Sequence, residues 1–181
     1  PLAIALFGAS GSGKTKTALR LALGIQRVQG GRIFVYDTEK RAQHYAPEDG
    51  LTAAPPPTLD FDHIDFPPPY HPDCWVDALD HAKTSGATVA IFDSASDEHE
   101  GPGGLLEMHE AELDKLAGND WPKRKAMTML AWDKPKRAHA RMVRKVQDVG
   151  LDVFFLFKAK EKLKIQKGKE PEKKGWMPVG S

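Results

Sequence analysis

A stretch near the start of the chain, Gly8 to Thr15, has the residue types and spacing of a phosphate-binding loop. It follows the apolar run of residues 2–7 and precedes a segment whose apolar residues recur at helical spacing. This order of strand, glycine-rich loop and helix is the context that a P-loop requires. Glycines let successive backbone N–H groups point at an anion, and the helix N-terminus adds its positive dipole end. A glycine-rich turn with accidental spacing is the alternative, but the complete motif and both flanks favour the P-loop.

The motif predicts that a nucleoside triphosphate binds here with Mg²⁺, and we expect the nucleotide to be ATP. Lys14 would reach the β- and γ-phosphates, and the Thr15 hydroxyl would ligate the metal. Residues 88–93 form an apolar run that ends in Asp93, the Walker B pattern, which delivers a second metal ligand after a P-loop. The predicted nucleotide contacts are Gly8, Ala9, Ser10, Gly11, Ser12, Gly13, Lys14, Thr15 and Lys16.

Acidic residues also follow the apolar run of residues 32–36, where Asp37, Thr38 and Glu39 come in succession. In open α/β sheets ligands bind at the carboxyl ends of the strands, so these carboxylates are candidates for the site. Asp37 is the weaker candidate, because we expect it to cap the turn. For Glu39 the alternative is an ordinary surface acid at a strand end.

Length and composition favour one domain over residues 1–181, with 40% hydrophobic and 28% charged residues. Cys74 is the single cysteine, which excludes an internal disulfide and is typical of a reducing cytoplasm, the expected location. The net charge is only +1, yet residues 121–175 hold 17 Lys/Arg against 6 Asp/Glu. This segregation favours a polyanionic partner, and a solvated lysine-rich face is the alternative.

Hydrophobic periodicity predicts an α/β fold, a mostly parallel sheet with helices on both faces. We expect helices over residues 14–29, 75–86 and 105–116, and a further helix that Asp133 caps and Gly150 ends. We expect strands over residues 2–7, 32–36, 88–93 and 151–157, a short edge strand within 58–66, and an exposed hairpin formed by 162–167 and 176–179. The proline-rich residues 46–72 predict a stiff surface connection, and residues 94–104 a polar, flexible loop.

The strand-end residues Asp37-Thr38-Glu39 and Ile91-Phe92-Asp93-Ser94 resemble the ATPase core of RecA-type recombinases. The chain is most similar to small phage-encoded RecA-like ATPases associated with single-strand annealing. The stretches that match are 93–96, 100–104, 131–136, 155–161 and 177–180. The resemblance implies that Glu39 activates the water that attacks the γ-phosphate, and that Lys158 or Lys160 senses this phosphate. Members continue past the last stretch, so we expect a further C-terminal segment beyond this core.

The resemblance also implies two DNA-binding loops, one after Asp93 and one after Phe157. The first is acidic and therefore a poor surface for phosphates, whereas the second is rich in lysine. The predicted DNA contacts are Lys162, Lys164 and Lys167, with Arg141 and Arg144 as weaker candidates. Trp121 or Trp176 would be available to stack on bases, although core packing is the more typical role of a tryptophan.

Three functions are compatible with these features. The first is a DNA-stimulated ATPase of phage recombination or single-strand annealing. Its expected partners are single-stranded DNA and further copies of the chain, and a single-strand-binding protein is a further candidate. The second is a small-molecule kinase, which would need an arginine-rich lid, whereas the basic residues here are mostly lysines. The third is a nucleotide-gated recruitment module with little hydrolysis. A GTPase is disfavoured because no Asn-Lys-x-Asp motif occurs.

Overall fold

The computed structural model describes residues 1–45, 60–164 and 172–178. Strands and helices alternate through most of this chain. Their bounds are β1 (Ala3–Gly8), α1 (Lys14–Gln29), β2 (Arg32–Asp37), the 3₁₀ turn η1 (Ala42–Tyr45), β3 (Asp62–Asp65), α2 (Pro72–Thr84), β4 (Ala87–Asp93), α3 (Asp97–Glu100), α4 (Leu105–Ala117), α5 (Trp121–Ala131), α6 (Asp133–Asp148), β5 (Asp152–Lys164) and β6 (Glu172–Pro178).

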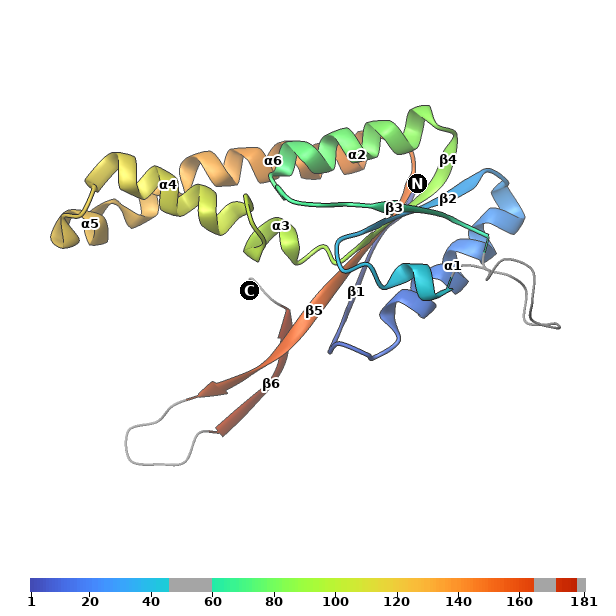
Figure 1. The fold of residues 1–181 in the computed structure, drawn as a ribbon, viewed down its shortest axis with the longest axis horizontal. Coiled ribbons are helices and arrows are strands. Elements are labelled where there is room, and N and C mark those ends of the chain that lie inside the picture. The colour runs from blue at the N-terminus through green and yellow to red at the C-terminus, as the bar shows by residue number, and fades with distance from the viewer. Residues whose placement is uncertain (46–59, 165–171, 179–181) are drawn as a thin grey trace.

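Five strands form one parallel sheet in the order β1-β5-β4-β2-β3. The short strand β3 lies at an edge, as its weak sequence pattern predicted. Beyond the sheet, β5 continues and pairs with β6 in antiparallel register. Figure 1 shows this strand pair projecting away from the helices. The α/β fold with a mainly parallel sheet is therefore confirmed. An antiparallel strand pair follows it as predicted, but its register differs, because residues 176–178 pair with 159–161 and not with 162–167. Residues 165–167 and 179 of the predicted hairpin lie outside the described residues.

Helices cover both faces of the sheet, as expected, because each central strand alternates apolar side chains between two cores. On one face, α1 buries Ala18, Leu19 and Ala22 against the sheet. On the other, α2 and α6 lie side by side (Figure 1) and bury residues such as Trp75 and Met142. Burial on both faces is what parallel strands require and explains their nearly continuous apolar sequences.

Two expectations about local structure are wrong, and one helix was not expected. Residues 94–104 contain the short helix α3, and Ser94, Ser96 and Glu98 are buried, so this segment is not simply an exposed polar loop. The basic stretch after Asp120 forms helix α5, which the periodicity did not indicate. Trp121 at its start is 74% exposed and therefore does not belong to the core.

The ends of α6 differ from expectation by one residue each. Asp133 is the first helical residue, and Trp132 occupies the N-cap without a side-chain hydrogen bond. Val149 is the C-cap, and Gly150 follows it with φ of 73°, the left-handed conformation typical of the residue after a helix. Most of the proline-rich segment, residues 46–59, lies outside the described residues. No helix in the described ranges has the length and apolar character needed to cross a membrane.

Candidate functional site

The registers of the sheet bring the ends of β1, β2 and β4 to one edge, which β5 passes at Lys158. Gly8 at the end of β1 pairs with Lys158 of β5, and Asp37 at the end of β2 pairs with Asp93 of β4. Strands β4 and β5 are themselves neighbours, with Asp93 opposite Leu156. The glycine-rich loop, both acidic strand ends and Lys158 therefore meet at the carboxyl edge of the sheet, where α/β proteins bind ligands.

The loop between β1 and α1 has the conformation that its glycines predict. Gly11 and Gly13 have φ of 78° and 86°, values that residues with a Cβ rarely adopt. A Cβ at Gly8 would lie 2.5 Å from the Ser12 hydroxyl. Helix α1 begins at Lys14 without a side-chain cap, so the N–H groups of its first turn are not occupied by a capping side chain. Such a helix start is suited to bind phosphate.

The loop borders a cavity of about 300 Å³. The residues that line it are Ser10, Gly11, Gly13, Lys14, Thr15, Glu39, Arg41, Tyr45, Asp93, Ser94 and Lys158. Most of the predicted nucleotide contacts therefore lie together with Glu39 and Asp93. The exposed Lys16 is not among the lining residues. Gly8 and Ala9 instead hold the P-loop lysine, because Lys14 Nζ donates to both of their carbonyl oxygens at 2.9 Å.

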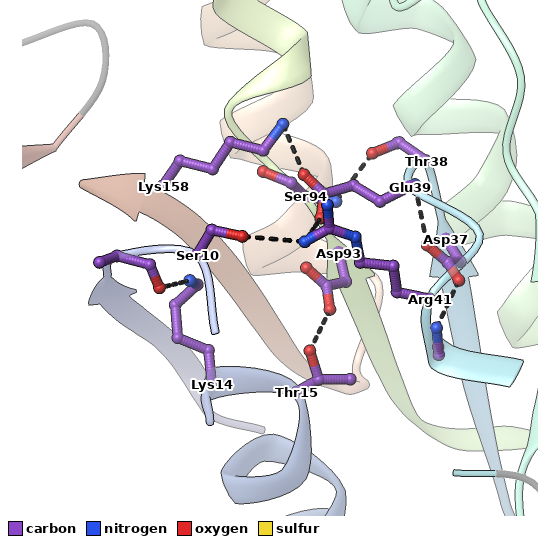
Figure 2. A network of polar contacts seen from close by, with 12 residues as sticks. Ser10, Lys14, Thr15, Asp37, Thr38, Glu39, Arg41, Asp93, Ser94 and Lys158 are labelled. Carbon is purple, nitrogen blue, oxygen red and sulfur yellow. Dashed lines mark hydrogen bonds and ion pairs between the residues drawn. The ribbon is translucent and has the colours of Figure 1, made fainter. Parts of the chain in front are cut away.

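The two predicted metal ligands are in direct contact across the cavity (Figure 2). The Thr15 hydroxyl donates to Asp93 Oδ2 at 2.5 Å. Burial raises the pKa of the Asp93 carboxyl above its ordinary value, because the charged form loses its hydration. A buried carboxylate beside a hydroxyl is the kind of oxygen pair that Mg²⁺ uses together with substrate phosphates and water. The residues present thus fit a magnesium ion, which Thr15 and Asp93 would hold and which would neutralise phosphate charge.

Asp37 fixes the loop that carries Glu39. Its carboxylate is 1% exposed and accepts hydrogen bonds from the backbone N–H groups of Glu39, at 2.9 Å, and Ala42, at 2.7 Å. His63 Nε2 lies 3.0 Å from the same carboxylate. Asp37 therefore caps the turn, as expected, and Glu39 is the carboxylate of this loop that lines the cavity.

Glu39 is held by two cations. Lys158 Nζ lies 2.6 Å from Glu39 Oε1, and Arg41 lies 3.5 Å from Oε2 (Figure 2). Arg41 also donates to the Ser10 hydroxyl of the P-loop at 2.8 Å. Sequence reasoning did not select Arg41, because a single arginine in a strand-end loop has no fixed spacing that marks it as a site residue.

Further polar contacts fix the segment that follows β4. The Thr38 hydroxyl donates to Asp97 at 2.5 Å and accepts from the Ser94 N–H at 2.9 Å. The Lys158 N–H donates to the buried Ser96 hydroxyl at 2.9 Å. The acidic segment after Asp93 is therefore joined to the end of β2 and to the middle of β5.

The residues predicted to contact DNA are largely not placed by the structure. The side chains of Lys160, Lys162 and Lys164 lie outside the described residues, and so does the whole of Lys167. The backbone places the first three in the part of β5 that extends toward β6. Of the weaker candidates, Arg141 forms an ion pair with Asp73 at 2.8 Å, and Arg144 is exposed.

The parallel sheet, the P-loop and the strand-end carboxylates define the class of P-loop nucleoside triphosphatases. The chain belongs to the AAA domain family, whose sequence model matches residues 1–180. Membership indicates a nucleotide-binding domain with ATPase activity, and proteins of this family generally bind ATP with Mg²⁺. Comparison with curated proteins gives no match.

Proposed function

We propose that this protein is a DNA-stimulated ATPase of the RecA-like group that acts in phage recombination or single-strand annealing. The observation that supports hydrolysis most directly is that Lys14, Glu39 and Asp93 line one cavity although they come from three separate segments, the start of α1, the loop after β2 and the end of β4. Lys14 and the N–H groups of the P-loop would bind the phosphates. Glu39, a carboxylate at the cavity wall, would orient water and accept its proton as it attacks the γ-phosphate.

DNA is the partner that the charge distribution favours. Strand β5 leaves the nucleotide cavity at Lys158 and continues into the antiparallel pair with β6. Strand β5 carries two of the lysines predicted from sequence, Lys162 and Lys164, whereas Lys167 lies outside the described residues. A lysine-rich strand pair that begins at the ATP site would track a single strand electrostatically and couple its binding to the nucleotide. Further copies of the chain and a single-strand-binding protein complete the proposed set of partners.

One observation favours a second candidate, a nucleotide-gated recruitment module with little hydrolysis. Glu39 is paired with Lys158 at 2.6 Å, and a carboxylate oxygen that is held by an ammonium group is not available to orient a water molecule. If the pair persisted with ATP bound, the protein would bind nucleotide and hydrolyse it very slowly.

ATP turnover measured with and without single-stranded DNA separates the two candidates. For the DNA-stimulated ATPase we expect turnover to rise at least tenfold with DNA, and Glu39→Gln to abolish that rise while ATP still binds. Turnover that neither DNA nor Glu39→Gln changes would contradict the assigned role of Glu39. Tight ATP binding with negligible turnover in both conditions would instead support the recruitment module.

A further inference from the structure

One side of helix α6 lines an open groove. Its side chains there follow one another at alternating intervals of four and three residues, and they are Trp132, Lys136, His139, Val143 and Val146. They border two cavities, of about 660 Å³ and about 260 Å³. The two cavities adjoin, because both are lined by Ala95, Glu98, His139 and Phe157. We call the combined cavity the α6 groove.

The other walls of the α6 groove are mostly apolar and come from several elements. Phe155 and Phe157 of β5 form the wall that the sheet supplies. Met129 of α5 lines the groove near the start of α6, and Ala3 of β1 lines it near the end of the helix. Met129 is 74% exposed and Val143 is 37% exposed. Apolar side chains gathered in a concave, open site are typical of an interaction surface.

The rim of the groove carries a positive charge that has no counter-ion. The buried Glu98 carboxylate is compensated by His139 at 2.8 Å. Other basic residues of α6 are paired with acids, namely Lys134, Arg137, Arg141 and Lys145. Lys136 is exposed and lines the groove, and it has no ion pair within residues 1–45, 60–164 and 172–178. A free cation beside an apolar surface favours an acidic ligand.

We propose that the α6 groove binds an acidic amphipathic helix of a different protein. Residues at alternating intervals of four and three form a continuous row along a helix, which is the geometry that packs against a second helix. The partner helix would lay its apolar stripe between this row and the sheet, with an acidic residue against Lys136. The groove shares no lining residue with the nucleotide cavity, so the inference does not depend on the proposed ATPase function.

A second copy of the chain is disfavoured as the source of this helix. Within the part of the chain that the structure describes, α1 and α5 are the helices with more than one exposed large apolar side chain. Both contain basic and no acidic residues, so they would be repelled by Lys136. Helix α4 is rich in acidic residues, but Leu106 is its single large apolar side chain that is exposed in the described structure.

Single-stranded nucleic acid also fits the groove less well than a helix does. Bases bind to proteins by stacking on open aromatic faces. The Trp132 ring already stacks with His109, with centroids 4.4 Å apart, and Phe157 stacks with Phe7 at 5.1 Å. Aliphatic lining, as at Val143, suits the aliphatic side chains of a helix.

Fluorescence anisotropy of a labelled model peptide, titrated with the full chain, tests the proposal. The probe is a peptide of about 18 residues, or five helical turns, with leucine at alternating intervals of three and four and glutamate on the opposite face. One control peptide has the same composition with its leucines scattered, and another has lysine in place of glutamate. We expect the acidic amphipathic peptide to bind saturably and at least about tenfold more tightly than either control.

Variants of α6 locate the surface that binds the peptide. Lys136→Glu should weaken binding about tenfold at low salt and less at high salt, where charges are screened. The matched control is Arg144→Glu, an exposed charge reversal on the same helix but outside the groove, which should change the affinity by less than about twofold. Val143→Glu should also weaken binding, because a carboxylate would then lie in the apolar groove. Since Lys136 is exposed, its replacement tests the groove even if Val143→Glu does not fold.

The contrary outcomes are distinct. Equal binding of the amphipathic peptide and either control would overturn the inference, as would no binding at all. Equal losses in Lys136→Glu and Arg144→Glu would place the binding surface elsewhere and overturn it too. Single-stranded oligothymidylate that displaces the peptide from the wild type would assign the groove to nucleic acid instead. None of these measurements uses ATP turnover, so their failure leaves the proposed function standing.

Discussion

At the end of β2, the Asp37 carboxylate faces three hydrogen-bond donors, the N–H groups of Glu39 and Ala42 and the His63 ring. An asparagine in its place would present one amide oxygen and an NH₂ group, so at least one donor would lose its partner. We expect Asp37→Asn to lower the free energy of unfolding by about 1–3 kcal/mol, the cost of an unsatisfied buried polar group. We also expect ATP turnover to fall several-fold, because Glu39 loses its anchor.

Urea unfolding and ATP turnover measure the two effects of Asp37→Asn. The control is Asp65→Asn, which replaces an exposed aspartate at the end of the neighbouring strand β3. We expect this control to change the unfolding free energy by less than about 0.5 kcal/mol. Wild-type stability and turnover in Asp37→Asn would contradict the positioning role assigned to Asp37.

Individual site residues were predictable where a motif fixes their chemistry. Thr15 and Asp93 are 78 positions apart, yet the P-loop and the Walker B pattern each indicate a metal ligand, and the two side chains meet. Arg41 had no such support, because a single arginine in a turn has neither periodicity nor a fixed spacing to a partner. Its contacts with Ser10 and Glu39 depend on how Asp37 folds the loop, which only the three-dimensional structure reveals.

At the level of elements, one ion pair joins the segment after β4 to helix α6. Both oxygens of the buried Glu98 carboxylate contact His139 Nδ1, at 2.8 and 3.1 Å. The hydrogen bond to Glu98 raises the pKa of His139 above its ordinary value, although burial acts in the opposite direction. A raised histidine pKa stabilises the fold fully below about pH 6.5, the unfolded value, and this stabilisation is lost as pH rises through the folded pKa.

Replacement of Glu98 should therefore lower the free energy of unfolding most in mild acid, where His139 is charged. We expect the unfolding free energy of the wild type to exceed that of Glu98→Gln by about 1 kcal/mol at pH 6, because His139 is half exposed and its ion pair is partly screened. The difference should shrink by pH 8.5, and urea unfolding at the two pH values measures it. A difference that grows as pH rises would show that the pair is not ionic.

The antiparallel pair of β5 and β6 is the element that we expect to bind single-stranded DNA. Replacement of Lys162 and Lys164 by alanine removes two positive charges that we expect to contact phosphates. Single-stranded DNA binding should weaken, and the slope of log affinity against log salt should fall by about 1.4, since each contact contributes about 0.7 on a single strand. Fluorescence titrations at several salt concentrations measure the slope. Lys123→Ala with Lys125→Ala on α5 is the charge-matched control, and an unchanged slope in the Lys162/Lys164 variant would remove this strand from the interface.

Elements with a buried apolar stripe were predictable, and those without one were not. Helix α1 matches the expected range, residues 14–29, because its apolar residues face the sheet. Helix α5 buries only Ala131 and exposes Met129 and Leu130, so its sequence has no stripe that points to a core. The sequence does contain a signal for the start of this helix, because Asp120 caps the Lys123 N–H and a proline follows Trp121.

For the whole molecule, the nucleotide site and the fold share the same elements. Helix α1 starts at the P-loop and packs on the sheet through Ala18 and Leu19. A ligand bound at the N-terminus of α1 therefore contacts an element of the hydrophobic core and should stabilise the folded state. Binding to the folded state alone raises stability in proportion to the logarithm of ligand concentration over its dissociation constant. Thermal unfolding therefore reports nucleotide binding without any assay of hydrolysis.

A non-hydrolysable ATP analogue with Mg²⁺, at a hundred times its dissociation constant, should add about 2.7 kcal/mol and raise the melting temperature by about 5–10 °C. Lys14→Ala should lose most of this rise at the same concentration, because Lys14 is the P-loop cation expected to bind the phosphates. Without nucleotide the variant should melt within a few degrees of the wild type, since the lysine contacts only the carbonyl groups of Gly8 and Ala9 among the hydrogen bonds described. Mg²⁺ alone is the control, and an equal rise in wild type and variant would mean that the nucleotide binds elsewhere.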